Sequence, residues 1–343
     1  MTLNVKLLKN TLTLMLILLA AFVTYEAIFV NNNPLNYFSP QSASSTVYVE
    51  NGVSGVVTIT DPSLHKTVGF NISYYPLETG SGVIVSKNGY IITAFHVIGD
   101  PQANTMNMLK KMSDKDIKLY VEQAAVSTYL SNYNPQLGTE LPNSNGMVSQ
   151  SNLSANTRMT TDLLIQNNLI SVSSYKQVIR VKFPASSGSS PLNAHLVDVG
   201  NSGNDNDIAL LKVDPAGRNL PVLKISSQNP KTGENIRIYG YPASSNMTQA
   251  QLSVTPSTTT GSLISEIHNS HNTIYYKTNA STFPGYSGGP VLNSKNEVIG
   301  ILIYGVQSKG SFIRQVESRY GLFLSSDYII QICKKNKVPI DIV

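Results

Sequence analysis

Residues 283–290 read Phe283-Pro284-Gly285-Tyr286-Ser287-Gly288-Gly289-Pro290, a serine within a glycine-rich turn. Glycines on both sides of Ser287 remove Cβ atoms, so the backbone can turn sharply and its N–H groups can converge on one small space. Such a space suits the oxyanion of a carbonyl group that the serine hydroxyl attacks. An ordinary hairpin loop uses the same turn residues, so the octapeptide alone leaves both interpretations open.

Two other segments favour the catalytic interpretation. From Gly80 to Ile98, two β-branched runs are joined by Asn88-Gly89, which predicts a hairpin with His96 just beyond its second strand. Farther along the chain, Asp207 opens an apolar strand that ends at Val213, where a carboxylate can be buried against an imidazole.

Other histidines and one other aspartate compete for these roles. Asp205 lies close to Asp207, but only Asp207 directly precedes the apolar strand. The remaining histidines lack a strand-end position with small neighbours, and we expect them on the surface or in loops: His65, His195, His268 and His271.

The chain order His96, Asp207, Ser287 is that of the trypsin-like serine proteases, which this sequence resembles, most closely in their HtrA-like branch. The segments that carry the resemblance are Gly80–Ile98, Asn206–Val213, Leu220–Ile225, Gly240–Pro242 and Gly285–Ile301. The resemblance implies an all-β fold of two antiparallel β-barrels with the site between them. It also implies a nucleophile at Ser287, a general base at His96, a carboxylate at Asp207 that fixes the imidazole, and an acyl-enzyme intermediate. The backbone N–H groups of Gly285 and Ser287 would form the oxyanion hole.

The resemblance also implies that a substrate strand pairs with the edge around Ile301 to Tyr304. We expect substrate contacts from Ser281, Thr282, Phe283, Ile301, Leu302, Ile303, Tyr304 and Gly305. None of these residues is charged, which favours a small or medium apolar side chain before the cleaved bond.

Two residues depart from the family pattern. Phe95 replaces the small or polar residue usual before the histidine, which reshapes the back of the site. Tyr286 replaces the aspartate with which digestive relatives pair a newly cut N-terminus, and tyrosine has no charge for that pairing. We therefore expect no activation by N-terminal cleavage.

The N-terminal region predicts a membrane anchor. Residues Thr11 to Val30 are mostly apolar and, as a helix, match the thickness of a bilayer. Lys6 and Lys9 precede the segment and no Lys or Arg follows until Lys66, which places the N-terminus in the cytoplasm and the remainder outside. A cleaved signal peptide, which would give a secreted protein, and a buried core helix are the alternatives.

The rest of the chain divides by pattern. We expect residues 1–30 to hold the cytoplasmic N-terminus and transmembrane helix, 31–46 a polar stalk, 47–219 the first barrel, and 220–343 the second barrel. The first barrel carries a helical insertion at about 101–175, with helices over about Asp114 to Leu130 and Thr161 to Ile170. A C-terminal helix is expected over Ser326 to Asn336. The chain after Ser287 is long enough only to close a barrel and add this helix, so no PDZ domain is expected.

Composition narrows the class of partner. A net charge of +5 with only 13% charged residues and no basic runs indicates no nucleic-acid partner. The single cysteine, Cys333, excludes an intramolecular disulfide. No metal-ligand cluster, phosphate-binding loop or cofactor motif is visible, so no cofactor is expected. The sequence predicts a membrane-anchored serine endopeptidase acting on proteins or peptides; a catalytically silent peptide-binding or surface interaction protein is the alternative.

Overall fold

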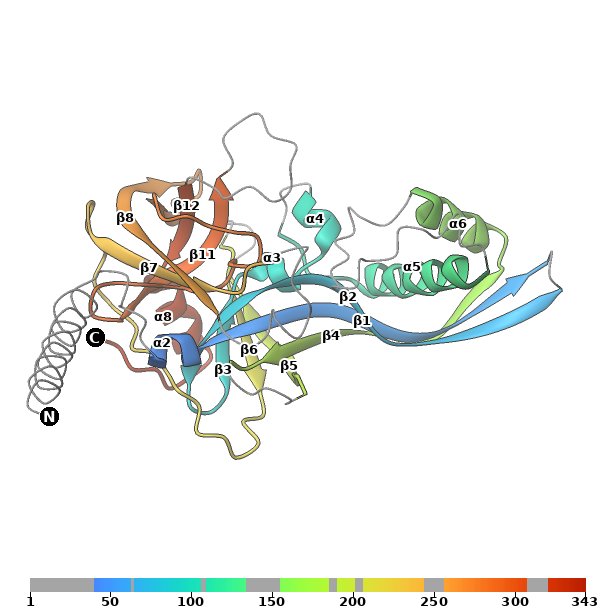
Figure 1. Ribbon diagram of the computed structural model, residues 1–343, viewed down its shortest axis with the longest axis horizontal. Coiled ribbons are helices and arrows are strands. Elements are labelled where there is room, and N and C mark those ends of the chain that lie inside the picture. Colours follow the sequence, from blue (N-terminus) through green and yellow to red (C-terminus); the bar gives the residue numbers. More distant parts are fainter. Residues whose placement is uncertain are drawn as a thin grey trace, which may run out of the picture. The chain divides into compact units, whose positions relative to one another are not determined.

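Two closed barrels, each of six antiparallel strands, form the core of the protein (Figure 1). The structure is a computed structural model that describes residues 40–62, 65–105, 109–133, 155–184, 190–200, 206–243, 256–306 and 320–343. The first barrel has the order β1-β2-β3-β6-β5-β4 and the second the order β10-β11-β12-β9-β8-β7. The strands are β1 Thr46–Asp61, β2 Lys66–Ser86, β3 Tyr90–Thr93, β4 Ile170–Lys182, β5 Leu192–Val199, β6 Ala209–Val213, β7 Asn235–Gly240, β8 Ser257–His268, β9 Ile274–Thr278, β10 Pro290–Leu292, β11 Val298–Val306 and β12 Tyr320–Ser325. The predicted all-β architecture of two barrels is confirmed.

The hairpin between β2 and β3 forms where the sequence predicts it. Ser86 pairs with Tyr90, and Gly89 adopts a φ of +88°, which a residue without a Cβ reaches at no steric cost. The apolar residues of both strands are buried in the barrel core. The hairpin delivers the chain to the short helix α3 (Phe95–Ile98), which carries His96.

The first barrel extends beyond its closed part into a long ladder. β1 and β2 are 16 and 21 residues long, and β4 pairs with β1 along most of its length, from Tyr48 to Ile59. Helix α5 (Asp114–Tyr133) packs along one face of this ladder, and Gly55 allows the approach because a Cβ there would lie 2.6 Å from Val121. The shared core consists of Val53, Val57, Ile59, Phe70, Leu77, Ile117, Tyr120, Val121, Ala125, Val126 and Leu130. The insertion therefore builds a core of its own, separate from that of the barrel.

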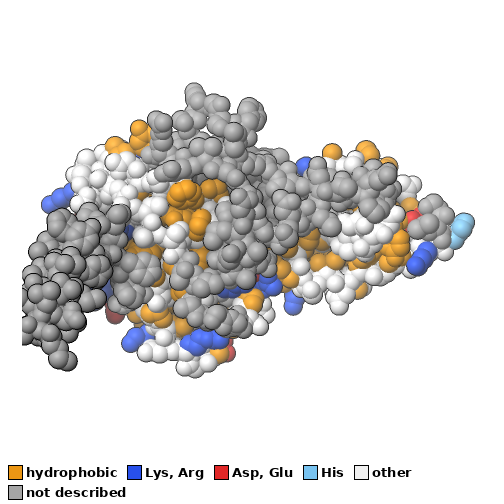
Figure 2. All heavy atoms as spheres, in the orientation of Figure 1, with side chains coloured by type: hydrophobic (Ala, Val, Ile, Leu, Met, Phe, Trp, Pro, Cys, Tyr) orange, Lys and Arg blue, Asp and Glu red, His pale blue; other side chains and the backbone are white. Residues whose placement is uncertain are grey.

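The helices of the insertion differ in part from expectation. Besides α5, the structure contains α4 (Pro101–Thr105) and α6 (Ala155–Gln166), whereas the sequence predicted the second main helix at about 161–170. The apolar Leu169 and Ile170 were read as the end of that helix, but β4 begins at Ile170. Helix α6 buries Thr157 and Thr161 and exposes Met159 and Leu163, the reverse of the usual pattern. Apolar side chains accordingly reach the surface in this part of the molecule (Figure 2).

The second barrel is compact and closes with the predicted C-terminal helix. Helix α8 (Ser326–Lys335) begins at the N-cap Ser325, whose side chain accepts the N–H of Asp327. Ile329, Ile332 and Cys333 of α8 are buried in the main core. The sequence also predicts a strand over Gln251–Thr255, which lies outside the described residues.

The N-terminal expectations fall mostly outside the described part of the chain, including the segment 11–30. Residues 41–46, expected to end the polar stalk, instead form most of α2 (Pro40–Ser45) and the start of β1. Ser42, Ser45 and Thr46 are fully buried, and Gln41 donates from its side chain to the carbonyl of Val222 at 2.9 Å. Serine and threonine read as linker residues from composition, but here their hydroxyls bond to the preceding turn. No helix among the described residues is long and apolar enough to cross a membrane.

Candidate active site

The first half of the site is a buried pair formed by His96 and Asp207. β3 ends just before α3, and Asp207 lies two residues before β6, which pairs with β3 through Thr93 and Ala209. Nδ1 of His96 lies 2.6 Å from Oδ2 of Asp207, and the backbone N–H of His96 donates to Oδ1 at 2.9 Å. Because the carboxylate holds both the ring and the backbone, it orients the imidazole and favours the tautomer with hydrogen on Nδ1. Nε2 is then left as the basic nitrogen.

The surroundings of His96 favour its protonated form. Burial alone would lower the pKa of His96, but the charge and hydrogen bond of Asp207, with a weaker contribution from Glu78, raise it above its ordinary value. Asp207 is only 1% exposed, so its attraction for the imidazolium is little screened by water. The pair can therefore accept a proton from a neighbouring hydroxyl and hold it.

The second half is the turn around Ser287, which is wedged against the first barrel. The N–H of Ser81 donates to the carbonyl of Ser287, and the Ser81 hydroxyl donates to the carbonyl of Gly285, both at 2.7 Å. Gly288 has a φ of +84°, and a Cβ there would overlap the carbonyl of Ser81 and the hydroxyl of Thr93. Only glycine fits this position.

These contacts bring the serine turn next to the histidine helix. The position of a Cβ on Gly288 lies 2.7 Å from the backbone nitrogen of Ala94, the residue that precedes α3. A Cβ on Gly80 would lie 2.6 Å from the side chain of Val97 and 2.9 Å from the carbonyl oxygen of Ser287. In the structure the Ser287 hydroxyl donates to the carbonyl of Ile303 at 3.1 Å. Its expected hydrogen bond to the imidazole stays a prediction.

The turn also offers backbone donors for an oxyanion. Gly285 has a φ of +88° and packs against the carbonyl of Tyr241. Within the part of the chain that the structure describes, no backbone hydrogen bond uses the N–H of Gly285 or Ser287. The intervening Tyr286 donates its own N–H to Phe283 at 3.1 Å. The role of these two N–H groups as an oxyanion hole stays a prediction.

The predicted substrate residues divide into two groups. The side chains of Ile301, Leu302 and Ile303 are at most 1% exposed, so they belong to the cores and only their backbone can contact a substrate. Tyr304 and Gly305 continue β11. On the opposite segment, Ser281 and Phe283 are half-buried and Thr282 is buried.

Tyr286 has a structural role in the described molecule. Its ring is buried, it packs against Phe283 at 5.5 Å between centroids, and its hydroxyl bonds to that of Ser257 at 2.5 Å. Burial raises the pKa of Tyr286, so the side chain is neutral. At the position where digestive relatives have a charged aspartate, this chain has a neutral tyrosine whose hydroxyl is hydrogen-bonded.

The competing residues lie elsewhere. His268 is exposed and bonds to Glu266 at 2.6 Å and to Asn272 at 2.9 Å, while His195 lies on the exposed side of β5. Asp205 falls outside the described residues.

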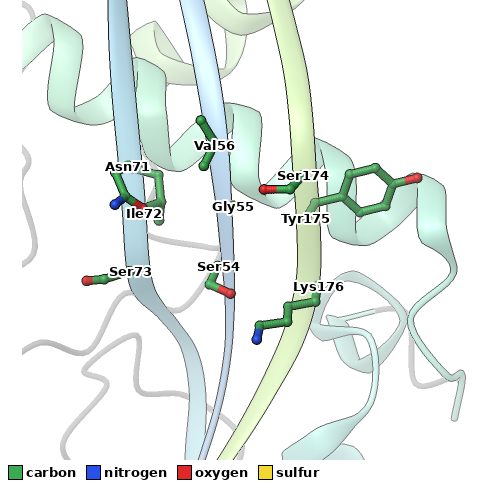
Figure 3. A pocket seen from close by; sticks show the side chains of 9 residues that line it. All are labelled: Ser54, Gly55, Val56, Asn71, Ile72, Ser73, Ser174, Tyr175 and Lys176. Atoms are coloured by element: carbon green, nitrogen blue, oxygen red, sulfur yellow. The ribbon is translucent and has the colours of Figure 1, made fainter.

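A hollow on the outer ladder is lined by Ser54, Gly55, Val56, Asn71, Ile72, Ser73, Ser174, Tyr175 and Lys176 (Figure 3). Its lining residues include no carboxylate and no histidine, and none of them belongs to the predicted catalytic set.

Sequence reasoning missed three residues at the junction. Ser81 and Thr93 join the two halves, since Ser81 also accepts the N–H of Tyr241 at 2.9 Å and Thr93 donates to the carbonyl of Ser81 at 2.7 Å. Glu78 is the third, a carboxyl group that acts on His96. The only sequence signal was the run Glu78-Thr79-Gly80-Ser81-Gly82, polar residues interleaved with glycine directly before a hairpin.

The chain is similar to trypsin-like peptidases over part of its length. A family model described as a trypsin-like peptidase domain matches residues 144–301, a range that includes Asp207 and Ser287 and begins after His96. A probable periplasmic serine endoprotease, DegP-like, from Pseudomonas fluorescens is 32% identical over 127 residues, which is 37% of this chain and 23% of that protein. A protein of the same description from Pseudomonas putida is 36% identical over 99 residues, 28% of this chain and 18% of that protein. The matched part thus spans less than a quarter of these curated relatives. The family-model match, the DegP-like relatives and the two antiparallel barrels together support a trypsin-like, HtrA-like serine protease.

Proposed function

We propose that this protein is a serine endopeptidase that hydrolyses peptide bonds through Ser287, His96 and Asp207. The observation that carries the proposal is the buried His96–Asp207 pair, which lies beside a turn that the first barrel holds through Ser81 and Gly288. A scaffold with no catalytic role has no need of a carboxylate that orients an imidazole, or of two backbone donors left unpaired next to a serine.

The proposed reaction proceeds in two halves. The Ser287 hydroxyl attacks the peptide carbonyl while Nε2 of His96 accepts its proton, and the N–H groups of Gly285 and Ser287 bind the oxyanion. Collapse of the tetrahedral intermediate breaks the C–N bond, and the imidazolium gives its proton to the leaving amine. Water then repeats the sequence on the acyl-enzyme, releasing the acid and restoring Ser287. Asp207 stays ionised throughout and stabilises the imidazolium.

Reaction with a fluorophosphonate probe tests this proposal. Phosphonylation needs an activated hydroxyl, so the parent should be labelled at Ser287, with the site identified by mass spectrometry. The variant Ser287→Ala should not be labelled, and Ser227→Ala, which removes a serine hydroxyl bonded to Val343, should be labelled like the parent. A parent that does not react, or equal labelling of Ser287→Ala, would overturn the proposal.

A silent peptide-binding protein is the second candidate. One observation favours it: the Ser287 hydroxyl donates to the carbonyl of Ile303. In a silent protein this bond would hold the hydroxyl away from a substrate. The same probe decides, because a serine kept in this bond would bind peptides without being labelled.

We further propose that residues 11–30 anchor the peptidase to the cell membrane with the barrels outside the cytoplasm. The apolar segment and the lysines before it support this arrangement. Substrates would then be exported proteins or peptides. After alkaline extraction of membranes, the full chain should stay in the pellet; recovery of a chain shortened at its N-terminus in the supernatant would instead indicate a cleaved signal peptide.

A further inference from the structure

Glu78 lies on the face of β2 that meets the histidine helix. Side chains two residues apart on a strand share a face, so Glu78 and Gly80 point to the same side. On that side Gly80 meets the side chain of Val97 and the carbonyl of Ser287. Glu78 also pairs across the ladder with Asn51, whose side-chain amide donates to the carbonyl of Gly99 at the end of α3. Both neighbours place the Glu78 carboxyl beside His96.

No lysine or arginine is paired with this carboxyl group. In the described ranges it forms no hydrogen bond or ion pair, and the one charged side chain whose field acts on it is His96. Burial raises the pKa of Glu78 to about 7, and the His96 charge opposes that rise only in part. Glu50, a more deeply buried carboxylate of the neighbouring strand, is paired with Arg180 at 2.7 Å and Lys182 at 2.9 Å. A half-buried carboxyl with no such partner is prepared to bind a cation from outside.

The position of Glu78 relative to the serine indicates which part of a substrate it would meet. The serine turn lies between two strands: Gly288 and Gly289 exchange hydrogen bonds with Leu302 of β11, and Ser287 accepts one from Ser81 of β2. If the acyl side of a substrate pairs with β11, the chain that crosses Ser287 leaves toward β2 and α3. That is also where His96 must protonate the leaving amine. Glu78 therefore faces the residues after the cleaved bond.

We propose that Glu78 forms a subsite for a lysine or arginine side chain at one of the first two positions after the cleaved bond. The inference rests on the proposed peptidase function and adds a substrate class to it. The ammonium or guanidinium group would form a charge-assisted hydrogen bond with the carboxylate and replace the counter-charge that the fold does not supply. No covalent step involves Glu78.

Matched peptides test the subsite by turnover. Internally quenched peptides would share an apolar residue before the cleaved bond and differ only in carrying lysine or its uncharged analogue norleucine at the first or second position after it. The parent should cleave the better lysine peptide with a kcat/KM about tenfold above its norleucine partner, the size of a charge-assisted bond. In Glu78→Gln this ratio should fall to about one, because the amide carries no charge. The control Glu234→Gln alters a second-barrel carboxylate that accepts the N–H of Lys231, and it should keep the ratio.

Two results would overturn the subsite. One is a parent that shows no lysine preference at either position. The other is a preference that survives in Glu78→Gln. If Glu78 acted on His96 alone, Glu78→Gln would shift the acid limb of the pH profile equally for all peptides and leave the ratios unchanged, which also counts against the proposal.

Binding to the inactive protein separates this inference from the peptidase proposal. Fluorescence anisotropy with Ser287→Ala needs no turnover, and it should show about tenfold tighter binding of the lysine peptide than of the norleucine peptide. Combining Ser287→Ala with Glu78→Gln should remove the difference. A protein that the fluorophosphonate does not label, yet that binds with this selectivity, would contradict catalysis and support the subsite. Labelling by the fluorophosphonate without a lysine preference in either assay would support catalysis and contradict the subsite.

Discussion

The two barrels have the same number of strands but use them differently. In the second barrel the longest strand has 12 residues, and the apolar residues divide between a core of their own and the core shared with the first barrel. In the first, β1 and β2 run far beyond the closed part and support a second core under α5 (Figure 1). The first barrel also holds His96, Asp207 and Glu78, whereas the second presents Ser287. In the proposed mechanism, the barrel that carries the helical insertion also supplies the proton-transfer residues, and the other barrel supplies the nucleophile.

The difference between the barrels predicts which substitutions should affect turnover and which should affect stability. The chemistry depends on the line where the barrels meet, which is fixed by Ser81, Thr93 and the glycines of the serine turn. The outer core shares strands with the site but not its packed residues. A lesion at the junction should alter turnover, and one in the outer core should alter stability.

The largest effect is expected from Asp207→Asn. The amide would hold the imidazole without stabilising its charge and would favour the wrong tautomer, so kcat should fall by about 10⁴-fold, as in serine proteases with this triad. Steady-state hydrolysis of one apolar peptide measures it. The control Asp214→Asn changes an aspartate just after β6 that only caps a turn by accepting the N–H of Ala216. A loss below about tenfold in Asp207→Asn would remove Asp207 from the proposed mechanism.

The next largest effect is expected from Gly288→Ala. A Cβ there meets the backbone of Ser81 and Ala94, which cannot move without shifting β2 and β3. The free energy of unfolding should fall by about 3 kcal/mol, part from the positive φ and part from the clash, and hydrolysis should fall with it. Gly233→Ala is the matched control, because Gly233 has the same φ of +84° and open space around it.

Denaturant unfolding of both glycine variants separates the two contributions. Gly233→Ala should cost only about 1 kcal/mol, the strain of the left-handed backbone. Equal losses in the two variants would mean that the junction tolerates the extra carbon atom. The barrels would then be joined less tightly than these contacts imply.

A smaller effect, on stability alone, is expected from Val121→Ala in α5. Val121 is fully buried in the outer core, so truncation should lower the free energy of unfolding by about 2 kcal/mol through lost burial and a residual cavity. kcat should stay within about twofold of the parent, since no residue of the site packs against this core. Leu163→Ala, at a position 51% exposed on α6, controls for a change on the surface of the same insertion. A fall in kcat that exceeds the fall in folded fraction would show that the insertion communicates with the site.

The parts of the fold predicted from the sequence are those with local causes. Asn88-Gly89 fixes a hairpin through its own backbone, and Ser325 with the apolar spacing of α8 fixes a helix. His96 and Asp207 could be paired in advance because each lies at the end of an apolar strand. The meeting of Ser287 with that pair came from resemblance, because no local pattern carries a contact between residues so far apart.

The parts not predicted are those in which tertiary packing overrides the pattern. Helix α6 buries threonines and exposes Met159 and Leu163, so apolar spacing placed the helix too late. Residues 41–46 read as a linker although Ser42, Ser45 and Thr46 are fully buried. Glu78 went unnoticed because a sequence shows that a glutamate is present but not that water is excluded from it.

The smallest effect, and the one that sharpens the comparison most, is the pH dependence of stability caused by Glu78. Its folded pKa of about 7 lies above the value of 4.5 for an ordinary glutamate, so across this window the folded chain binds more protons than the unfolded one. Stability contributed by the protonated carboxyl is therefore complete at low pH and is lost as the pH rises toward 7.

Glu78→Gln cannot ionise, so at about pH 8 it should be more stable than the parent by about 1 kcal/mol, a value reduced for the solvent contact of this carboxyl. The difference should vanish near pH 4 and should not appear in Glu234→Gln; denaturant titrations at both pH values measure it. If the parent is as stable as Glu78→Gln at high pH, the carboxylate already has a partner in the folded chain, and the first barrel carries no unpaired charge beside its histidine.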